Sequence, residues 1–213
     1  MATLVVRNLG RQPYEPVWQD MKTFTDQRTF HTEDEIWILE HDPVFTLGQA
    51  GKPEHVLCPV DIPVIKTDSG GQVTYPGSGQ LVFYFLLDIR RMHLGPRILV
   101  SGLESSVVNM LSQYDIKAVS RRDAPGVYVD GAKIAALGLR IRKMCSYHGL
   151  SFNLDMDLSP FRRINPCGYP DLPVTQLNDL APEKVSWQQA KDSLLNSFAE
   201  MLGYSCVMEK HAA

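Results

Sequence analysis

Cys167 is the residue of this sequence best suited to covalent chemistry, because of its two neighbours. It lies between Pro166 and Gly168, within residues 164–169 (Ile-Asn-Pro-Cys-Gly-Tyr). Proline biases the backbone toward a turn or an extended form, and glycine allows a positive φ or a close approach. We therefore expect Cys167 on a tight, exposed turn, where a nucleophile is accessible. The alternative is a small, buried apolar residue, as most cysteines are.

A cysteine nucleophile needs a base or a positive neighbour, because a free thiol with a pKa near 8.5 is only a few per cent thiolate at neutral pH. Residues 132–142 offer a candidate, since they alternate as a strand does. One face carries Lys133, Ala135, Leu137, Leu139 and Ile141, and the other carries Ile134, Ala136, Gly138 and Arg140. Lys133 is thus the single charge on an otherwise apolar face.

The sequence leaves the state of Lys133 open. At a strand end, its ammonium group can extend to water. In a buried position, its pKa would fall by a few units from about 10.4, and the amine would act as a base near neutral pH. Beside a thiolate, it would instead stay an ammonium that stabilises the ionised form of Cys167. The last two descriptions can belong to one coupled titration.

Residues 68–80 hold four glycines in 13 positions around a short β-prone segment. The spacing matches neither a P-loop nor a dinucleotide fingerprint, and the P-loop lysine is missing. Two interpretations remain open: a pair of tight hairpin turns, or bare backbone that lies against a ligand.

The elements that must position these residues mix strands and helices without strict alternation. Apolar periodicity predicts helices over residues 14–28 and 96–114, the second with Ile98 and Leu99 in its buried stripe. A last helix follows Ser186, which forms a capping-box pair with Gln189. Strands are predicted over residues 3–7, 35–41, 64–67, 81–87, 117–119, 126–129, 132–142 and 147–154.

Two of these strands bear on the site. The Asp130-Gly131 pair predicts a hairpin between residues 126–129 and 132–142. In residues 147–154, alternation places Gly149 and Ser151 on one face and His148, Leu150, Phe152 and Leu154 on the other. Residues 44–52 are expected to form a loop, and residues 170–184 to be irregular. Together the pattern predicts an α/β (α+β) fold: a single domain over residues 1–213, with a central mixed β-sheet flanked by helices and a smaller sheet.

Composition excludes several classes of protein. The 213 residues are 44% hydrophobic and 21% charged, as in an ordinary globular protein, and a net charge of −3 argues against general nucleic-acid binding. We expect no signal peptide and no membrane span. The four cysteines lack any C-x-x-C pair, so neither a metal site nor a disulfide scaffold is predicted, and a reducing cytoplasm is the expected compartment. Clusters of basic residues on a shared face would suit an acidic partner: Arg90-Arg91, Arg121-Arg122, Arg140/Arg142/Lys143 and Arg162-Arg163.

Five sequence blocks, taken together, resemble the lipoyl(octanoyl) transferase family in order and spacing. They are residues 70–75 (Gly-Gly-Gln-Val-Thr-Tyr), 123–128 (Asp-Ala-Pro-Gly-Val-Tyr), 133–140 (Lys-Ile-x-x-Leu-Gly-Leu-Arg), 148–150 (His-Gly-Leu) and 165–169 (Asn-Pro-Cys-Gly-Tyr). The resemblance covers roughly residues 5 to 170. It implies a fold similar to the catalytic domains of lipoate and biotin protein ligases.

The resemblance also implies an activity. Octanoyl would pass from octanoyl-acyl carrier protein to Cys167 as a thioester, with Lys133 as base or ion partner, and then to a lysine of a lipoyl domain. The acceptors implied are the lipoyl domains of 2-oxoacid dehydrogenase complexes and the glycine cleavage H protein; no cofactor, ATP, metal, nucleic acid or membrane is implied. The family's acyl-binding segments correspond to Ser69, Gly70, Gly71, Gln72, Val73, Thr74, Tyr75, Pro76, Ala136, Leu137, Gly138, Gly149, Leu150 and Ser151.

This chain departs from the family pattern in the glycine-rich loop. Ser69 stands where the family has arginine, Pro76 where it has histidine, and Ser78 where it has proline. Loss of a cation and an imidazole from the site would slow transfer or alter substrate choice. Three alternatives therefore stay open: an ATP-dependent lipoate or biotin ligase, a non-catalytic protein that binds acyl carriers or lipoyl domains, and, more distantly, a cysteine hydrolase.

Overall fold

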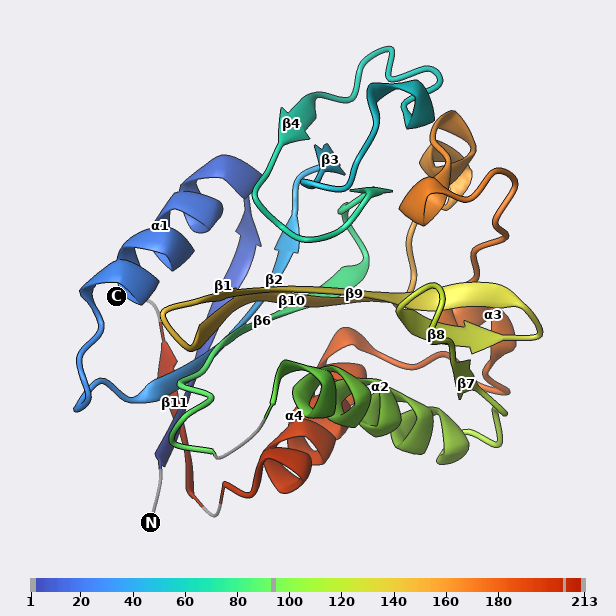
Figure 1. The fold of residues 1–213 in the computed structure, drawn as a ribbon. Coiled ribbons are helices and arrows are strands. Elements are labelled where there is room, and N and C mark those ends of the chain that lie inside the picture. The colour runs from blue at the N-terminus through green and yellow to red at the C-terminus, as the bar shows by residue number, and fades with distance from the viewer. Residues whose placement is uncertain (1–2, 93–94, 205, 212–213) are drawn as a thin grey trace.

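A large mixed sheet forms the centre of the computed structural model, which describes residues 3–92, 95–204 and 206–211 (Figure 1). Its strand order is β11-β1-β2-β6-β10-β9-β8-β7. β1 runs parallel to β2 and to β11, and the other neighbours are antiparallel. The bounds are β1 (Thr3–Gln12), β2 (Asp34–His41), β6 (Gln80–Leu86), β7 (Val119–Ser120), β8 (Gly126–Val129), β9 (Ala132–Arg142), β10 (Cys145–Asn153) and β11 (Cys206–His211). The mixed sheet predicted from the sequence is confirmed.

Helices cover both faces of this sheet. In Figure 1, α2 (Pro96–Ser112) and α4 (Trp187–Leu202) lie below it, while α1 (Tyr14–Gln27) and a small second sheet lie above. The lower core joins the α2 and α4 stripes to alternate residues of the strands, such as Phe83 and Phe85. The upper core joins Met21 of α1 to Tyr84 and Tyr147. Ile98, predicted to be buried, is 60% exposed, because Leu99 and Leu103 set the buried stripe of α2.

The small sheet consists of β3 (Phe45–Leu47), β4 (Val64–Lys66) and β5 (Val73–Thr74), in the order β4-β3-β5. Its apolar side packs on Phe161 of the 3-10 segment η2 (Ser159–Arg163) and on Ile164. Two further 3-10 segments are η1 (Pro53–His55) and η3 (Pro166–Gly168), and η3 lies beside β5. The second sheet was predicted, but β3 lies in residues predicted to be a loop. The segment predicted to be irregular after Cys167 contains one short helix, α3 (Leu177–Leu180).

Local signals for two elements are confirmed. The Ser186 hydroxyl and the Gln189 side chain make both bonds of the capping box that begins α4. Asp130 and Gly131 both have positive φ, 47° and 84°, as expected for the predicted hairpin turn between β8 and β9.

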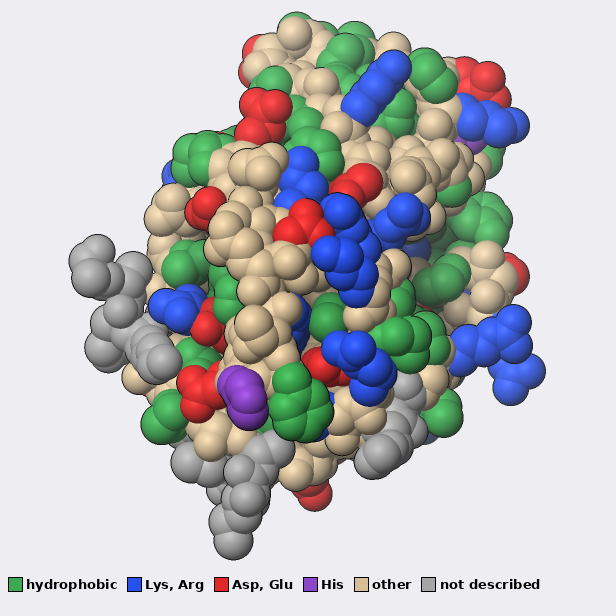
Figure 2. All heavy atoms as spheres, turned by 60° about the vertical axis from the view of Figure 1, so that its left-hand side comes forward, with side chains coloured by type: hydrophobic (Ala, Val, Ile, Leu, Met, Phe, Trp, Pro, Cys, Tyr) green, Lys and Arg blue, Asp and Glu red, His purple; other side chains and the backbone are tan. Residues whose placement is uncertain are grey.

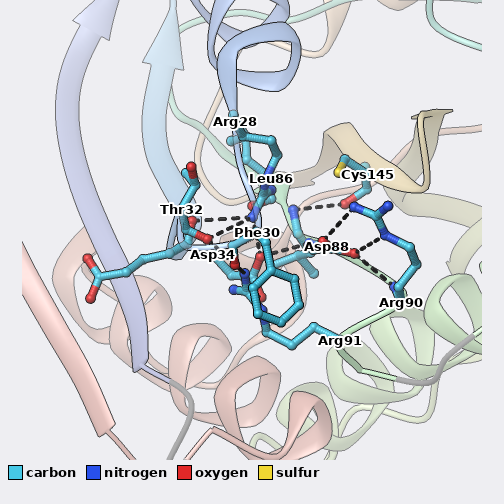
Figure 3. Close-up of polar contacts among 12 residues, drawn as sticks. Arg28, Phe30, Thr32, Asp34, Leu86, Asp88, Arg90, Arg91 and Cys145 are labelled. Atoms are coloured by element: carbon cyan, nitrogen blue, oxygen red, sulfur yellow. Dashed lines mark hydrogen bonds and ion pairs between the residues drawn. The ribbon is translucent and has the colours of Figure 1, made fainter.

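A buried ion network fastens the end of α1 to the sheet (Figure 3). The Asp34 carboxylate is fully buried. It forms ion pairs with Arg28 at 2.5 Å and Arg91 at 3.2 Å, and it accepts a hydrogen bond from the Tyr204 hydroxyl at 2.5 Å. It also accepts the backbone N–H of Asp88 at 2.7 Å. This network holds β2, β6 and the segment after α4 together, so the Arg90-Arg91 cluster is used at least partly inside the molecule.

Candidate active site

Cys167 lies on a single 3-10 turn, as the sequence predicted, but it is half-buried where an exposed position was expected. Its own backbone is left-handed, with φ 56° and ψ 21°, a conformation that few residues other than glycine adopt and that is often found at functional sites. Gly168 N–H donates to Asn165 O at 2.9 Å, and Tyr169 N–H donates to Pro166 O at 3.1 Å. Gly168 also has positive φ, 79°. The turn presents a half-buried thiol at the head of a short loop.

Hydrogen bonds on both sides fix this turn, one from the backbone and one from a side chain. Asn165 N–H donates to His55 O at 2.8 Å. The Tyr169 hydroxyl donates to Asp123 O at 2.8 Å, which ties the turn to the β7–β8 loop. Gln72 lies against the turn, because a Cβ added at Gly168 would be 3.0 Å from Gln72 Cδ. Gly168 therefore allows the glycine-rich loop to approach the cysteine.

Lys133 lies on the opposite face of β9 from the one predicted. The register between β8 and β9 shifts by one residue, so that Tyr128 pairs with Lys133 while Val127 pairs with Ala135. This β-bulge leaves Ile134 without a partner in the ladder, and Ile134 and Ala135 both enter the lower core. Lys133 is turned to the upper face, where it borders a small cavity together with Ala136 and Cys167.

The Lys133 ammonium is buried and in contact with the thiol. The side chain is 3% exposed, and Nζ lies 2.8 Å from Cys167 Sγ and 3.2 Å from Pro125 O. It also lies 5.1 Å from the centre of the Tyr128 ring. Burial alone would lower the pKa of Lys133, but the charge of Cys167 and hydrogen bonds to Cys167 and Tyr128 outweigh it and raise the pKa above its ordinary value. Solvent exposure of the amine, one of the three states left open by the sequence, does not occur.

A cavity opens from the thiol onto the upper face of the main sheet, beneath the small sheet. Its walls come from β6, β9 and β10, from the glycine-rich loop and from the start of α1. Most of the residues singled out from the sequence border it: Ser69, Gly71, Gln72, Val73, Thr74, Pro76, Ala136, Leu137, Gly138, Gly149, Leu150, Ser151 and Cys167. The structure thus brings together segments that are far apart in the sequence.

Two of the predicted substrate-binding residues do not border this cavity, and Lys133 borders only the smaller one. Tyr75 packs into the small sheet, with its ring 5.5 Å from Phe45 and 5.4 Å from Phe161. At Gly70, an added Cβ would lie 3.6 Å from Leu139 O of β9. Five lining residues were not predicted as site residues: Tyr14, Thr46, Val82, Tyr84 and His148. Thr46 lies in a segment predicted to be a loop. The periodicity of the other four marks element positions, but periodicity does not tell a core position from the wall of a buried cavity.

His148 also differs from its predicted position. It has φ 60°, so the alternation of β10 breaks there and its ring does not join Leu150 and Phe152 in the lower core. Instead Nε2 lies 3.0 Å from Asp68 Oδ1, and the ring stacks on Tyr147. Asp68 also accepts the Trp18 indole N–H at 2.7 Å and the Tyr147 hydroxyl at 2.5 Å. Burial would raise the pKa of Asp68, but these hydrogen bonds hold it well below its usual range.

Two of the three departures from the family pattern in the glycine-rich loop, Ser69 and Pro76, border the cavity. Ser69 Oγ lies 2.9 Å from Thr67 Oγ1, so the loop is closed by a hydroxyl pair where the family pattern has a cation. Pro76 keeps a backbone role, since its carbonyl accepts the N–H of Val44 at 3.0 Å. Among the described residues, no group of three His, Cys, Asp or Glu side chains is arranged to hold a metal ion, and no helix has the length and apolar character to cross a membrane.

The architecture defines a class of protein. The structure superposes on lipoate-protein ligase A bound with ATP with a TM-score of 0.71 at 15% identity, covering 100% of this chain and 89% of that one. A bi-partite lipoate protein ligase from Thermoplasma acidophilum gives a TM-score of 0.76 at 16% identity, covering 100% and 88%. A biotin protein ligase from Aquifex aeolicus gives 0.57 at 12% identity, covering 95% and 70%. At these identities the likeness shows the fold, that of lipoate and biotin ligase catalytic domains.

Sequence comparison identifies the family. The family described as the lipoyl protein ligase A/B catalytic domain matches residues 13–199, and the chain belongs to it. An octanoyltransferase from Cellvibrio japonicus is 58% identical over 206 residues, 96% of each chain. Octanoyltransferases from Shewanella denitrificans and Hahella chejuensis are 58% and 55% identical, over 97% and 98% of this chain and 90% and 92% of theirs. That one catalytic domain occupies all of residues 1–213 stays a prediction.

Proposed function

We propose that this chain is an octanoyltransferase of protein lipoylation that works through a Cys167 thioester. The observation that carries the proposal is the 2.8 Å contact between Lys133 Nζ and Cys167 Sγ beside the cavity. Identity of 55–58% to three octanoyltransferases supports the acyl group. The raised pKa of Lys133 favours its ammonium form.

The reaction divides into two acyl transfers. In the first, Cys167 Sγ attacks the carbonyl carbon of the octanoyl thioester, the bond to the carrier sulfur breaks, and the Lys133 ammonium supplies the proton for the leaving thiol. In the second, the amine of an acceptor lysine attacks the enzyme thioester and forms an amide. Lys133, now an amine, takes the proton of the attacking nitrogen, which restores the thiolate and ammonium. No nucleotide is needed, since the energy of the amide comes from the thioester.

The walls of the cavity suit a saturated acyl chain. Val73, Val82 and Ala136 provide apolar surface, and each buried methylene contributes about 0.8 kcal/mol. Stabilisation of the oxyanion requires N–H donors beside the thiol. The sequence points to the backbone of Gly70, Gly71, Gly138 and Gly149 for this role. Because the strand register places Gly138 and Gly149 two residues beyond Ala136, away from Cys167, we keep only Gly70 and Gly71 of the glycine-rich loop as proposed donors.

We further propose octanoyl-acyl carrier protein as donor, and as acceptors the lipoyl domains of 2-oxoacid dehydrogenase complexes and the glycine cleavage H protein. The free thiols of Cys58, Cys145 and Cys167 fit a reducing cytoplasm. The basic clusters give these partners limited support. In Figure 2, Lys and Arg side chains lie in separate groups with Asp and Glu between them. One arginine of each basic cluster pairs with a carboxylate, as Arg121 does with Asp123 and Arg163 with Asp61.

Intact-mass spectrometry with octanoyl-acyl carrier protein, in the absence of ATP and acceptor, tests the proposal. An octanoyl adduct should form on the parent protein, be absent from Cys167→Ala, and disappear when a lipoyl domain is added. If the folded protein binds the carrier but gains no adduct, the transferase proposal fails and a non-catalytic binding protein takes its place. If acylation of a lipoyl domain requires ATP, a ligase takes its place.

A further inference from the structure

The register of the central strands divides the cavity into rows. Ala136 of β9, Ser151 of β10 and Val82 of β6 are paired across the sheet and form the first row. Gly138, Gly149 and Tyr84 are paired in the same way and form the second row. All six residues border the cavity. Cys167 adjoins the first row, because it also borders the small cavity that contains Lys133 and Ala136.

The cavity ends just beyond the second row. The next pair along the two strands is Arg140 and Tyr147. In the part of the chain that the structure describes, neither of these residues borders the cavity. Arg140 Nη1 donates to Gln49 Oε1 at 2.5 Å, and the Tyr147 hydroxyl donates to Asp68. At this end the cavity is bordered by His148, which lies between Tyr147 and Gly149 and whose Nε2 is 3.0 Å from Asp68 Oδ1.

The depth of the cavity matches the proposed acyl group. Two residues of antiparallel strand separate the rows by about 7 Å. An extended alkyl chain with bonds of about 1.5 Å advances about 1.3 Å per bond, so the seven carbon–carbon bonds of octanoyl span about 9 Å. With its carbonyl at Cys167 beside Ala136, an octanoyl chain therefore ends at the row of Gly138 and Gly149.

Glycine occupies the two facing positions, Gly138 and Gly149, for different physical reasons. A Cβ at Gly149 would lie 1.8 Å from Phe83 O, so glycine is required there by the close approach of β6. At Gly138 the backbone has no positive φ, and an added Cβ would meet nothing within 4 Å. Gly138 lies two residues from Ala136 on the same face of β9, the face that borders the cavity. Backbone geometry thus does not require glycine at this position.

We propose that Gly138 sets the longest acyl chain that the enzyme accepts, because its missing side chain leaves the space that the last carbons of octanoyl fill. This inference rests on the proposed function and adds a specificity-determining residue to it. A side chain at Gly138 occupies the end of the cavity without touching the thiol. A side chain of the same size at Ala136 would instead obstruct the cavity beside Cys167.

The test compares rates of acyl-enzyme formation on Cys167 with butanoyl, hexanoyl, octanoyl and decanoyl carrier proteins. Gly138→Val should lower the octanoyl-to-hexanoyl rate ratio at least about tenfold, in the range expected for a change of one or more methylenes in a pocket. Its hexanoyl rate should stay near that of the parent protein. Ala136→Val should slow hexanoyl and octanoyl together. Gly95→Val is the matched control, because a Cβ at Gly95 also meets nothing within 4 Å and Gly95 precedes α2 rather than bordering the cavity. This variant should leave the octanoyl-to-hexanoyl rate ratio unchanged.

The outcomes separate this inference from the proposed function. An unchanged ratio in Gly138→Val, or a parallel loss of hexanoyl and octanoyl transfer, overturns the role of Gly138 while the parent protein is still acylated. Absence of any octanoyl adduct on the parent Cys167 overturns the proposed function and the inference with it. If Gly138→Val does not fold, Gly138→Ala adds one carbon and should lower the same ratio severalfold; an unchanged ratio there is equally decisive.

Discussion

Removing the charge of Lys133 should slow acylation of Cys167 by about two orders of magnitude. Lys133→Met keeps an unbranched side chain of similar length but deletes the cation. Two unit charges 2.8 Å apart attract by about 6 kcal/mol at an effective dielectric constant of 20. Because Cys167 is half-buried, solvent screening reduces this to about 3 kcal/mol, which corresponds to a rate factor of about 150.

Lys133→Arg separates the two roles of the lysine. Arginine keeps a positive charge but does not lose its proton in proteins. Gly126 leaves room for the larger group, since a Cβ there would lie 3.3 Å from Lys133 Cε. If Lys133 only stabilises the thiolate, Lys133→Arg should retain formation of the acyl-enzyme. If Lys133 also gives its proton to the leaving thiol and takes one from the acceptor amine, acylation and transfer should both slow in Lys133→Arg, although Cys167 keeps its reactivity toward a small alkylating agent.

Two assays measure these effects. Alkylation of Cys167 by iodoacetamide, followed by peptide mass spectrometry, reports thiolate reactivity without any substrate. Single-turnover acylation and discharge report the two halves of the reaction. Lys191→Met is the matched control: Lys191 is 4% exposed and pairs with Asp192, and its removal should leave Cys167 reactivity unchanged. The reasoning is refuted if folded Lys133→Met alkylates and acylates within about threefold of the parent protein.

Three further predictions concern the framework of the site. Burial lowers the pKa of His41 to about 4, so between pH 6.5 and 4 the unfolded chain binds a proton that the folded chain does not. The free energy of unfolding should therefore fall by up to about 3 kcal/mol as the pH falls through that range. Urea denaturation should show this fall in the parent protein, and His41→Gln should lack it. Asp34→Asn leaves Arg28 and Arg91 without their carboxylate partner around a buried amide. It should destabilise the fold by about 3–5 kcal/mol, measured as a lower thermal midpoint. Gly149→Ala places a methyl group against Phe83 O and should cost about 1–3 kcal/mol, whereas Gly138→Ala should be close to neutral; equal stability of the two glycine variants would contradict the assigned packing.

Much of the framework follows from local signals that survive in the folded chain. The period-2 and period-3.6 patterns place the main strands and the helices α1, α2 and α4, because each of these elements buries one side against a core. The Pro166-Cys167-Gly168 turn is equally local, since proline and glycine act on their own backbone. β11 is different: it completes the sheet by pairing in parallel with β1, a contact between opposite ends of the chain. No local pattern specifies such a partner.

The sequence pattern predicted the wrong face of β9 for Lys133, again because the structure depends on a partner strand. Alternation along residues 132–142 assumes an unbroken ladder, and it assigns Lys133 to the face of Ala135 and Leu137. The bulge at Ile134 is a property of the pairing between β8 and β9, not of β9 alone, so only the partner strand reveals it. By turning Lys133 over, the bulge keeps the strand's apolar residues in the lower core and gives the upper face a single buried amine. Lys133 is 34 positions from Cys167 in the sequence, and it reaches the thiol because the bulge adds one residue to β9.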